Sequence, residues 1–262
     1  MLRFSHGSVN SREALQKRLK RNNAHCHVNY HILVAKAFFV NHKDFIVYKI
    51  LIFTSILSTM PLQNRVTPYG NIIATPERGT LLGNRGVLIN QQRQLVRNYQ
   101  VKRWICCQLQ YKGRWRPVMQ PNRWTELFFL DEATAFAAGH RPCFECRNAA
   151  AKTFQAAWEK DGLGPSNVAA MDAVLDQDRK HPGGSKKTYT APVSSLPDGV
   201  FITVNDQAWL KHQGKFLRWT PGGYTEAKPI ISSTVTVLTP KSTVAVIAAG
   251  YQLGIHPSAT QF

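Results

Sequence analysis

Alternating hydrophobic and polar positions predict short β-strands in the part of the chain that follows residue 60. Trp104 and Cys106 alternate with Ile105 and Cys107, so the two sets point to opposite faces of one strand. Turn residues separate this strand from two others. Strands are therefore expected at residues 103–111, 115–119 and 124–130. The stretch before them, residues 66–90, is punctuated by glycine and proline and predicts further short strands and tight turns.

Helical signals cluster around and after these strands. Asp131 stands where a helix N-cap belongs, and Gly139 closes the alanine-rich run that follows it. Met171, Val174 and Leu175 share one apolar face of a later segment. Helices are therefore expected at residues 91–99, 132–138, 148–160, 168–179 and 241–249.

The C-terminal half repeats a strand pattern after its first helix. The turn signal Leu196-Pro197-Asp198-Gly199 precedes a set of short apolar segments. A second small antiparallel sheet is expected from residues 200–204, 206–210, 216–219 and 235–238. The predicted fold class is α+β, with a small antiparallel sheet and a zinc knuckle first and a second small β-sheet with helices after it.

The net charge of the chain favours one class of binding partner. The chain has 262 residues, and 33 Lys and Arg face 15 Asp and Glu, which gives a formal charge of +18. Such an excess suits a phosphate-rich partner, so DNA or RNA is the expected partner. A basic surface without a specific partner is the alternative. With 44% hydrophobic residues, the chain can bury a core, and intrinsic disorder does not describe it.

The first 59 residues differ in composition from the rest of the chain. They carry nine Lys or Arg against Glu13 and Asp44, which leaves +11 for residues 60–262. Residues 45–57 are apolar but shorter than the roughly 20 residues of a membrane helix. Three interpretations stay open: a start codon assigned too early, a weak membrane anchor, or a real amphipathic extension. The favoured one is a non-native extension before Met60, with no membrane association.

Two cysteines in a C-x-x-C spacing carry the clearest chemistry. Cys143 and Cys146 flank two residues in a predicted turn, a spacing at which both thiolates reach one Zn²⁺. A redox pair is the alternative, but Phe144-Glu145 after Arg-Pro is not typical of one. The five cysteines do not have the even spacing of a secreted disulfide scaffold, so a reducing, cytoplasmic location is expected.

The run FFLDEATAFAAGHRPCFECR at residues 128–147 resembles the second half of the metal-binding domain of Ada-type DNA alkylation-repair proteins. The resemblance covers about residues 104–147, and it extends to small zinc modules appended to nucleases. It implies a structural zinc held by Cys143 and Cys146, two more ligands upstream on or beside a strand, and a DNA-repair or DNA-processing context.

This chain departs from the family in its upstream ligands. The family has a C-x-x-x-C pair, one cysteine of which accepts an alkyl group, whereas this chain has the adjacent Cys106 and Cys107. Neighbours on a strand point to opposite faces, so both reach one ion only across a bulge. Cys106 and Cys107 are thus both candidate ligands, one of them being expected in the core, and His140 is a further candidate.

Arginines beside tryptophans are the candidates for contact with nucleic acid. Their guanidinium groups would bind phosphate while the aromatic rings stack on bases. Buried tryptophans with arginines extending outward are the alternative. The candidates beside tryptophans are Arg103, Arg114, Arg116 and Arg123, and Arg141 and Arg147 next to the two cysteines are further candidates.

Catalytic residues are not defined by the sequence. Asp172 and Asp176 share a predicted helix face, and with Asp178 and His181 they are a candidate site for a divalent ion, with His212 or His256 as a base. Exposed charges on a helix explain the same spacing. The domains expected are an extension at 1–59, an Ada-like zinc-binding domain at 60–160 and an α+β region at 161–262. The leading hypothesis is a zinc protein that binds nucleic acid; the alternatives are a metal-dependent nuclease or other hydrolase, and a zinc-stapled protein adaptor.

Overall fold

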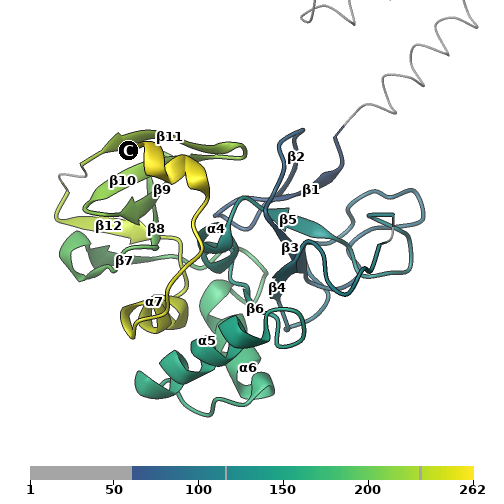
Figure 1. Ribbon diagram of the computed structural model, residues 1–262, viewed down its shortest axis with the longest axis horizontal. Coiled ribbons are helices and arrows are strands. Elements are labelled where there is room, and N and C mark those ends of the chain that lie inside the picture. Colours follow the sequence, from purple (N-terminus) through teal and green to yellow (C-terminus); the bar gives the residue numbers. More distant parts are fainter. Residues whose placement is uncertain (1–60, 116, 230–231) are drawn as a thin grey trace, which may run out of the picture. The chain divides into compact units, whose positions relative to one another are not determined.

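The computed structural model describes residues 61–115, 117–229 and 232–262, and residues 61–262 form one compact unit. In this described part the protein is mixed α+β, with two six-stranded sheets and four α-helices (Figure 1). The predicted α+β class is therefore confirmed. The expected extension at residues 1–59, including the apolar segment 45–57, lies outside the described residues.

The first sheet carries the cysteine region. Its strands run in the order β2-β1-β5-β3-β4-β6. Their bounds are β1 (Gln63–Val66), β2 (Ile72–Ala74), β3 (Leu81–Asn84), β4 (Ile105–Gln108), β5 (Leu127–Phe129) and β6 (Arg141–Pro142). The β1–β5 and β4–β6 pairs are parallel and the others antiparallel. The prediction of a purely antiparallel sheet was wrong here, because the chain reaches β6 through a helix and can then run alongside β4 in the same direction.

Helix α4 (Glu132–Ala137) connects this sheet to the cysteine turn. It begins at Asp131, whose side chain accepts a hydrogen bond from the Thr134 N–H at 2.8 Å. Gly139 follows it with φ +89°, and a Cβ there would lie 2.6 Å from Cδ of Arg179. The close approach and the left-handed backbone both require glycine.

Three further helices form a layer beside the cysteine turn. They are α5 (Asn148–Lys160), α6 (Val168–Arg179) and α7 (Lys241–Ala248), and α7 packs on both α5 and α6. Phe154 and Trp158 are the buried aromatic residues of α5, and Asn167 caps α6 by accepting from the Ala170 N–H at 3.0 Å. The predicted positions of these helices are confirmed to within one residue.

The second sheet is antiparallel throughout, as predicted for this half. Its order is β11-β10-β9-β8-β12-β7. The strands are β7 (Tyr189–Pro192), β8 (Phe201–Val204), β9 (Gln207–His212), β10 (Lys215–Thr220), β11 (Gly223–Lys228) and β12 (Thr234–Val237). Strands β7 and β11 add to the four expected.

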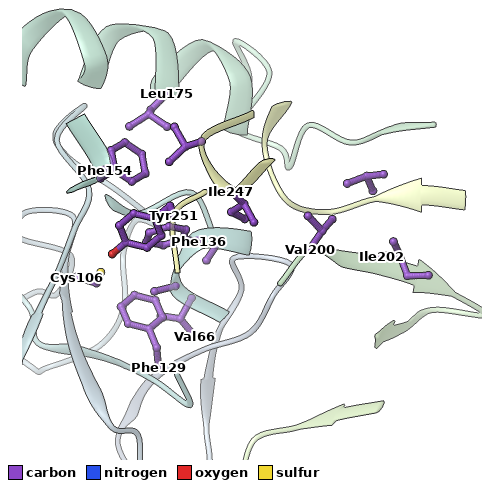
Figure 2. Close-up of a cluster of buried hydrophobic side chains, with 14 of the residues drawn as sticks. Val66, Cys106, Phe129, Phe136, Phe154, Leu175, Val200, Ile202, Ile247 and Tyr251 are labelled. Carbon is purple, nitrogen blue, oxygen red and sulfur yellow. The ribbon is translucent and has the colours of Figure 1, made fainter. Parts of the chain in front are cut away.

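One hydrophobic core draws on both sheets and the helices (Figure 2). Phe136 of α4 contacts Phe154 and Tyr251, with ring centroids 5.6 and 5.3 Å apart. Helix α4 lies between β5 of the first sheet and β8 of the second, which explains why all its residues are buried. None of the helices in the described ranges has the length and apolar character needed to cross a bilayer.

Two predicted elements are absent from the described structure. Residues 91–99 form no helix; the side chain of Asn90 accepts hydrogen bonds from the N–H groups of Gln92 and Gln94, which holds a polar turn instead. The strand expected at 115–119 is also missing among its described residues. Met119 there has φ +54° and donates its N–H to the Glu126 carboxylate, which is incompatible with an extended ladder.

Candidate metal centre

The two cysteines of strand β4 point to opposite faces of the first sheet. Its register with β3 is unbroken, with Cys107 opposite Leu82 and Cys106 opposite Gly83. Without a bulge, successive side chains alternate between faces. Cys106 is therefore fully buried in the core, whereas Cys107 is half-buried on the other face.

The cysteine turn is attached to β4 by backbone hydrogen bonds. Strand β6 lies parallel to β4, with Pro142 opposite Cys106, and the Cys143 N–H donates to the Cys106 carbonyl at 3.0 Å. Residues 144–147 then turn into α5. This arrangement brings the sulfur atoms of Cys107, Cys143 and Cys146 within 4.8 Å of one another. Three cysteines from two chain segments can thus hold one metal ion.

Hydrogen bonds favour the thiolate form of one of the three cysteines, Cys143. The Cys107 thiol hydrogen-bonds to Cys143, and the N–H groups of Cys146 and Glu145 also point at the Cys143 sulfur. Together they lower the pKa of Cys143 to about 5. The pKa of Cys107 is raised by that same hydrogen bond, and burial raises the pKa of Cys146. A metal ion would therefore displace protons from Cys107 and Cys146.

Cys106 and His140 lie outside this cluster. Burial raises the pKa of Cys106 to about 12, which favours its thiol form. Its sulfur faces Arg147, whose Nη1 lies 3.1 Å away. His140 is fully buried between aromatic rings and accepts a hydrogen bond from Arg85 Nε at 3.2 Å. Both residues stabilise the sheet and helix around the turn.

Buried ion pairs fix the cysteine turn from both sides. Arg141 makes a two-pronged contact with Asp172 of α6, with both N–O distances 2.8 Å. Arg147 donates to Glu132 of α4 at 2.6 Å. The guanidinium group of Arg141 is therefore buried and paired, which removes it from the surface that nucleic acid could reach. Arg147 is partly buried, and its contact with nucleic acid stays a prediction. Arg141 of the Arg-Pro-Cys run anchors the turn to α6, and Arg147 anchors it to α4.

The other candidate arginines have different surroundings. Arg103 and Arg123 are exposed to solvent. Arg114 pairs with Glu145 of the cysteine turn at 3.1 Å, but both side chains are more than half exposed, so the pair is weak. Arg116 is not among the described residues. The neighbouring Trp115 is 85% exposed, which makes it the most exposed large hydrophobic residue in the described ranges.

The acidic residues of α6 serve the fold. Asp172 pairs with Arg141, and Asp176 pairs with both Arg179 and Lys180. Asp178 accepts the Ser242 N–H at the start of α7. Among the described residues, only the three cysteines form a group of metal-ligating side chains. The divalent-ion site expected at Asp172, Asp176, Asp178 and His181 is therefore not assembled there, and neither His212 nor His256 joins such a group.

The burial of two cationic side chains was not predicted from the sequence. Arg85 and Arg179 are almost fully buried, and each guanidinium lies about 4 Å from the ring centre of Trp104. Nothing in their local sequence signals burial, since it depends on β3, β4 and α6 meeting around one tryptophan. Comparison with known proteins adds no further information, since no family model, curated protein or solved structure matches the chain.

Proposed function

We propose that Cys107, Cys143 and Cys146 bind zinc and that the ion locks the cysteine turn onto β4. The observation that carries this proposal is the convergence of three sulfur atoms within 4.8 Å. Thiolate sulfur is a preferred zinc ligand, and a Zn–S distance of about 2.3 Å suits a cluster of this size. The resemblance of residues 104–147 to an Ada-type metal-binding domain supports the same ion.

The role of the zinc is structural in this proposal. It would join Cys107 of β4 to the start of α5, next to the pairs that Arg141 and Arg147 make with α6 and α4. The four cysteines of the described part are free thiols, which fits a reducing compartment such as the cytoplasm. A structural zinc is held by four ligands, so a fourth ligand in addition to the three cysteines is expected to complete the tetrahedron.

Metal analysis of purified, reduced protein tests the proposal. About one zinc per chain is expected, lost in Cys107→Ser, Cys143→Ser and Cys146→Ser. Cys106→Ser is the matched control, because it removes a neighbouring thiol that points to the other face of the strand. Zinc that persists in the three variants, or that disappears in Cys106→Ser alone, would contradict the assignment.

The proposal includes DNA or RNA as the partner of the basic surface. It is supported by the charge of +11 on residues 60–262 and by Trp115, which is 85% exposed beside Arg114. An exposed ring next to cations suits base stacking combined with phosphate contact. The binding of a labelled single strand should weaken steeply with KCl, and Trp115→Ala should weaken it several-fold. Affinity that does not change with salt would contradict this part of the proposal.

A further inference from the structure

An open depression of about 580 Å³ lies on the surface of the protein, and none of the described cysteines lines it. It is lined by Arg97, Asn98, Tyr99, Gly183, Gly184 and Ser185. The loop that contributes the two glycines is open at Gly183, where no atom lies within 4 Å of the place of a Cβ. It packs on Tyr99 at Gly184, where a Cβ would lie 3.1 Å from the Tyr99 hydroxyl oxygen. The wall facing it combines the cation of Arg97 with the partly exposed aromatic ring of Tyr99.

The inner wall of this depression rests on a group of buried cations. Tyr99 packs on Trp104, with ring centroids 5.7 Å apart, and Trp104 in turn contacts Arg85 and Arg179. Arg85 also donates to the carbonyl of Asn98, which lines the depression. We call Arg85, Arg179 and Lys186 the cationic cluster.

The loop that lines the depression also contacts the cationic cluster. Lys186 follows the glycine loop and turns its ammonium group inward to the Ala137 carbonyl. Lys180 places its ammonium group 4.8 Å from the ring centre of Tyr99. Positive charge therefore surrounds the depression from behind and from one side, in addition to Arg97 on its wall.

Positive charge exceeds negative charge in this region. Among the described residues, the ion pairs of the cluster involve one carboxylate, Asp176, which binds Arg179 and is shared with Lys180. Two buried guanidinium nitrogens, Nη2 of Arg85 and Nε of Arg179, have no hydrogen-bond partner within the described structure. Burial lowers the pKa of Lys186 to about 7 and that of Arg85 to about 9, and Arg179 adds to both effects. Uncompensated cations next to an open depression attract an anion.

We propose that this depression is a binding site for a phosphate group, held by Arg97 and the Gly183–Ser185 loop and attracted by the cationic cluster behind Tyr99. Guanidinium groups match phosphate oxygens, and an open glycine loop allows close approach to the backbone. The site is independent of the zinc proposal, and it would give the nucleic-acid proposal a defined contact.

Calorimetric titration of the full chain with inorganic phosphate, at constant ionic strength, tests the site. Saturable binding is expected, and Arg97→Ala should weaken it by about tenfold or more, since a charge-assisted contact is lost. Arg78→Ala is the matched control, because Arg78 is exposed and does not line the depression, and its affinity should stay within about twofold of the native value.

A second pair of variants separates binding from folding. Ser185→Asp adds a negative charge to the wall and should abolish phosphate binding, whereas the neutral Ser185→Asn has nearly the same size and should retain it. Absence of saturable phosphate binding to the native chain would overturn the proposal. So would equal affinities for Ser185→Asp, Arg97→Ala and the native chain.

Competition identifies the source of the phosphate. Displacement of inorganic phosphate by a single-stranded oligothymidylate supports the site as a contact for nucleic acid. Phosphate binding that the oligonucleotide leaves unchanged supports a small phosphorylated molecule as the ligand. In that case the phosphate site stands and its use by nucleic acid fails, so the two proposals are distinguished.

Discussion

Loss of the Asp172 charge is predicted to destabilise the protein strongly through Arg141. The two side chains are joined by two hydrogen bonds of 2.8 Å, and their exposed fractions are 9% and 2%. Asp172→Asn keeps the size of the side chain but leaves the guanidinium buried without its counter-charge. Removing one partner of a buried ion pair costs about 3–5 kcal/mol, because the remaining charge cannot recover its hydration.

Urea unfolding of the zinc-loaded full chain, followed by circular dichroism, measures this change. For a chain of this size, a loss of about 3–5 kcal/mol corresponds to a fall in Tm on the order of 10 °C. Asp161→Asn is the control, since Asp161 is an exposed residue at the end of α5, and its effect should stay within about 0.5 kcal/mol.

A double variant distinguishes the cost of a buried charge that has lost its partner from the cost of lost packing. Arg141→Met combined with Asp172→Leu fills the same space without charge and should recover most of the stability lost in Asp172→Asn. A cost below about 1 kcal/mol for Asp172→Asn would refute the argument that this ion pair anchors the cysteine turn.

Two other buried polar groups yield predictions. Burial holds the pKa of His140 well below 6.5, so only the unfolded chain takes up this proton, and stability falls as pH drops below 6.5. His140→Gln should reduce the slope of unfolding free energy between pH 6.5 and 5 by up to about 1.4 kcal/mol per pH unit, and an unchanged slope would contradict a neutral buried imidazole. Asp131 accepts hydrogen bonds from the backbone and hydroxyl of Thr134, from the Tyr224 hydroxyl and from the His256 N–H. Asp131→Ala should therefore cost about 3 kcal/mol in urea unfolding, more than the roughly 1 kcal/mol of an ordinary N-cap, which is the value expected if only the cap matters.

Elements with strong local signals could be predicted closely from the sequence. Helix α6 begins after Asn167 and ends near Arg179 as expected, because a capping side chain and an apolar face determine both its bounds and its orientation. The Cys143–Cys146 turn is equally local, since Gly139 allows the left-handed backbone that ends α4 and Pro142 restricts φ just before the turn. Residues 91–99 misled the prediction because side-chain hydrogen bonds from Asn90 replace helical ones.

Features that depend on distant segments could not be predicted. Alternation indicated that Cys106 and Cys107 face opposite sides of a strand, but which side meets the turn is decided by the pairing of β4 with β6. The burial of Arg141 depends on Asp172, which lies 31 residues away. Neither the partner nor the burial is visible in the residues next to Arg141, so an exposed phosphate contact was expected instead.

X-ray absorption at the zinc edge tests the central claim most directly, because it counts the sulfur atoms around the metal in the protein itself. Three sulfur neighbours at about 2.3 Å are expected in the native chain, and two in Cys107→Ser, provided that this variant is loaded with zinc before measurement. A shell of oxygen and nitrogen alone, or a sulfur count that Cys107→Ser leaves unchanged, would contradict a zinc centre built from Cys107, Cys143 and Cys146.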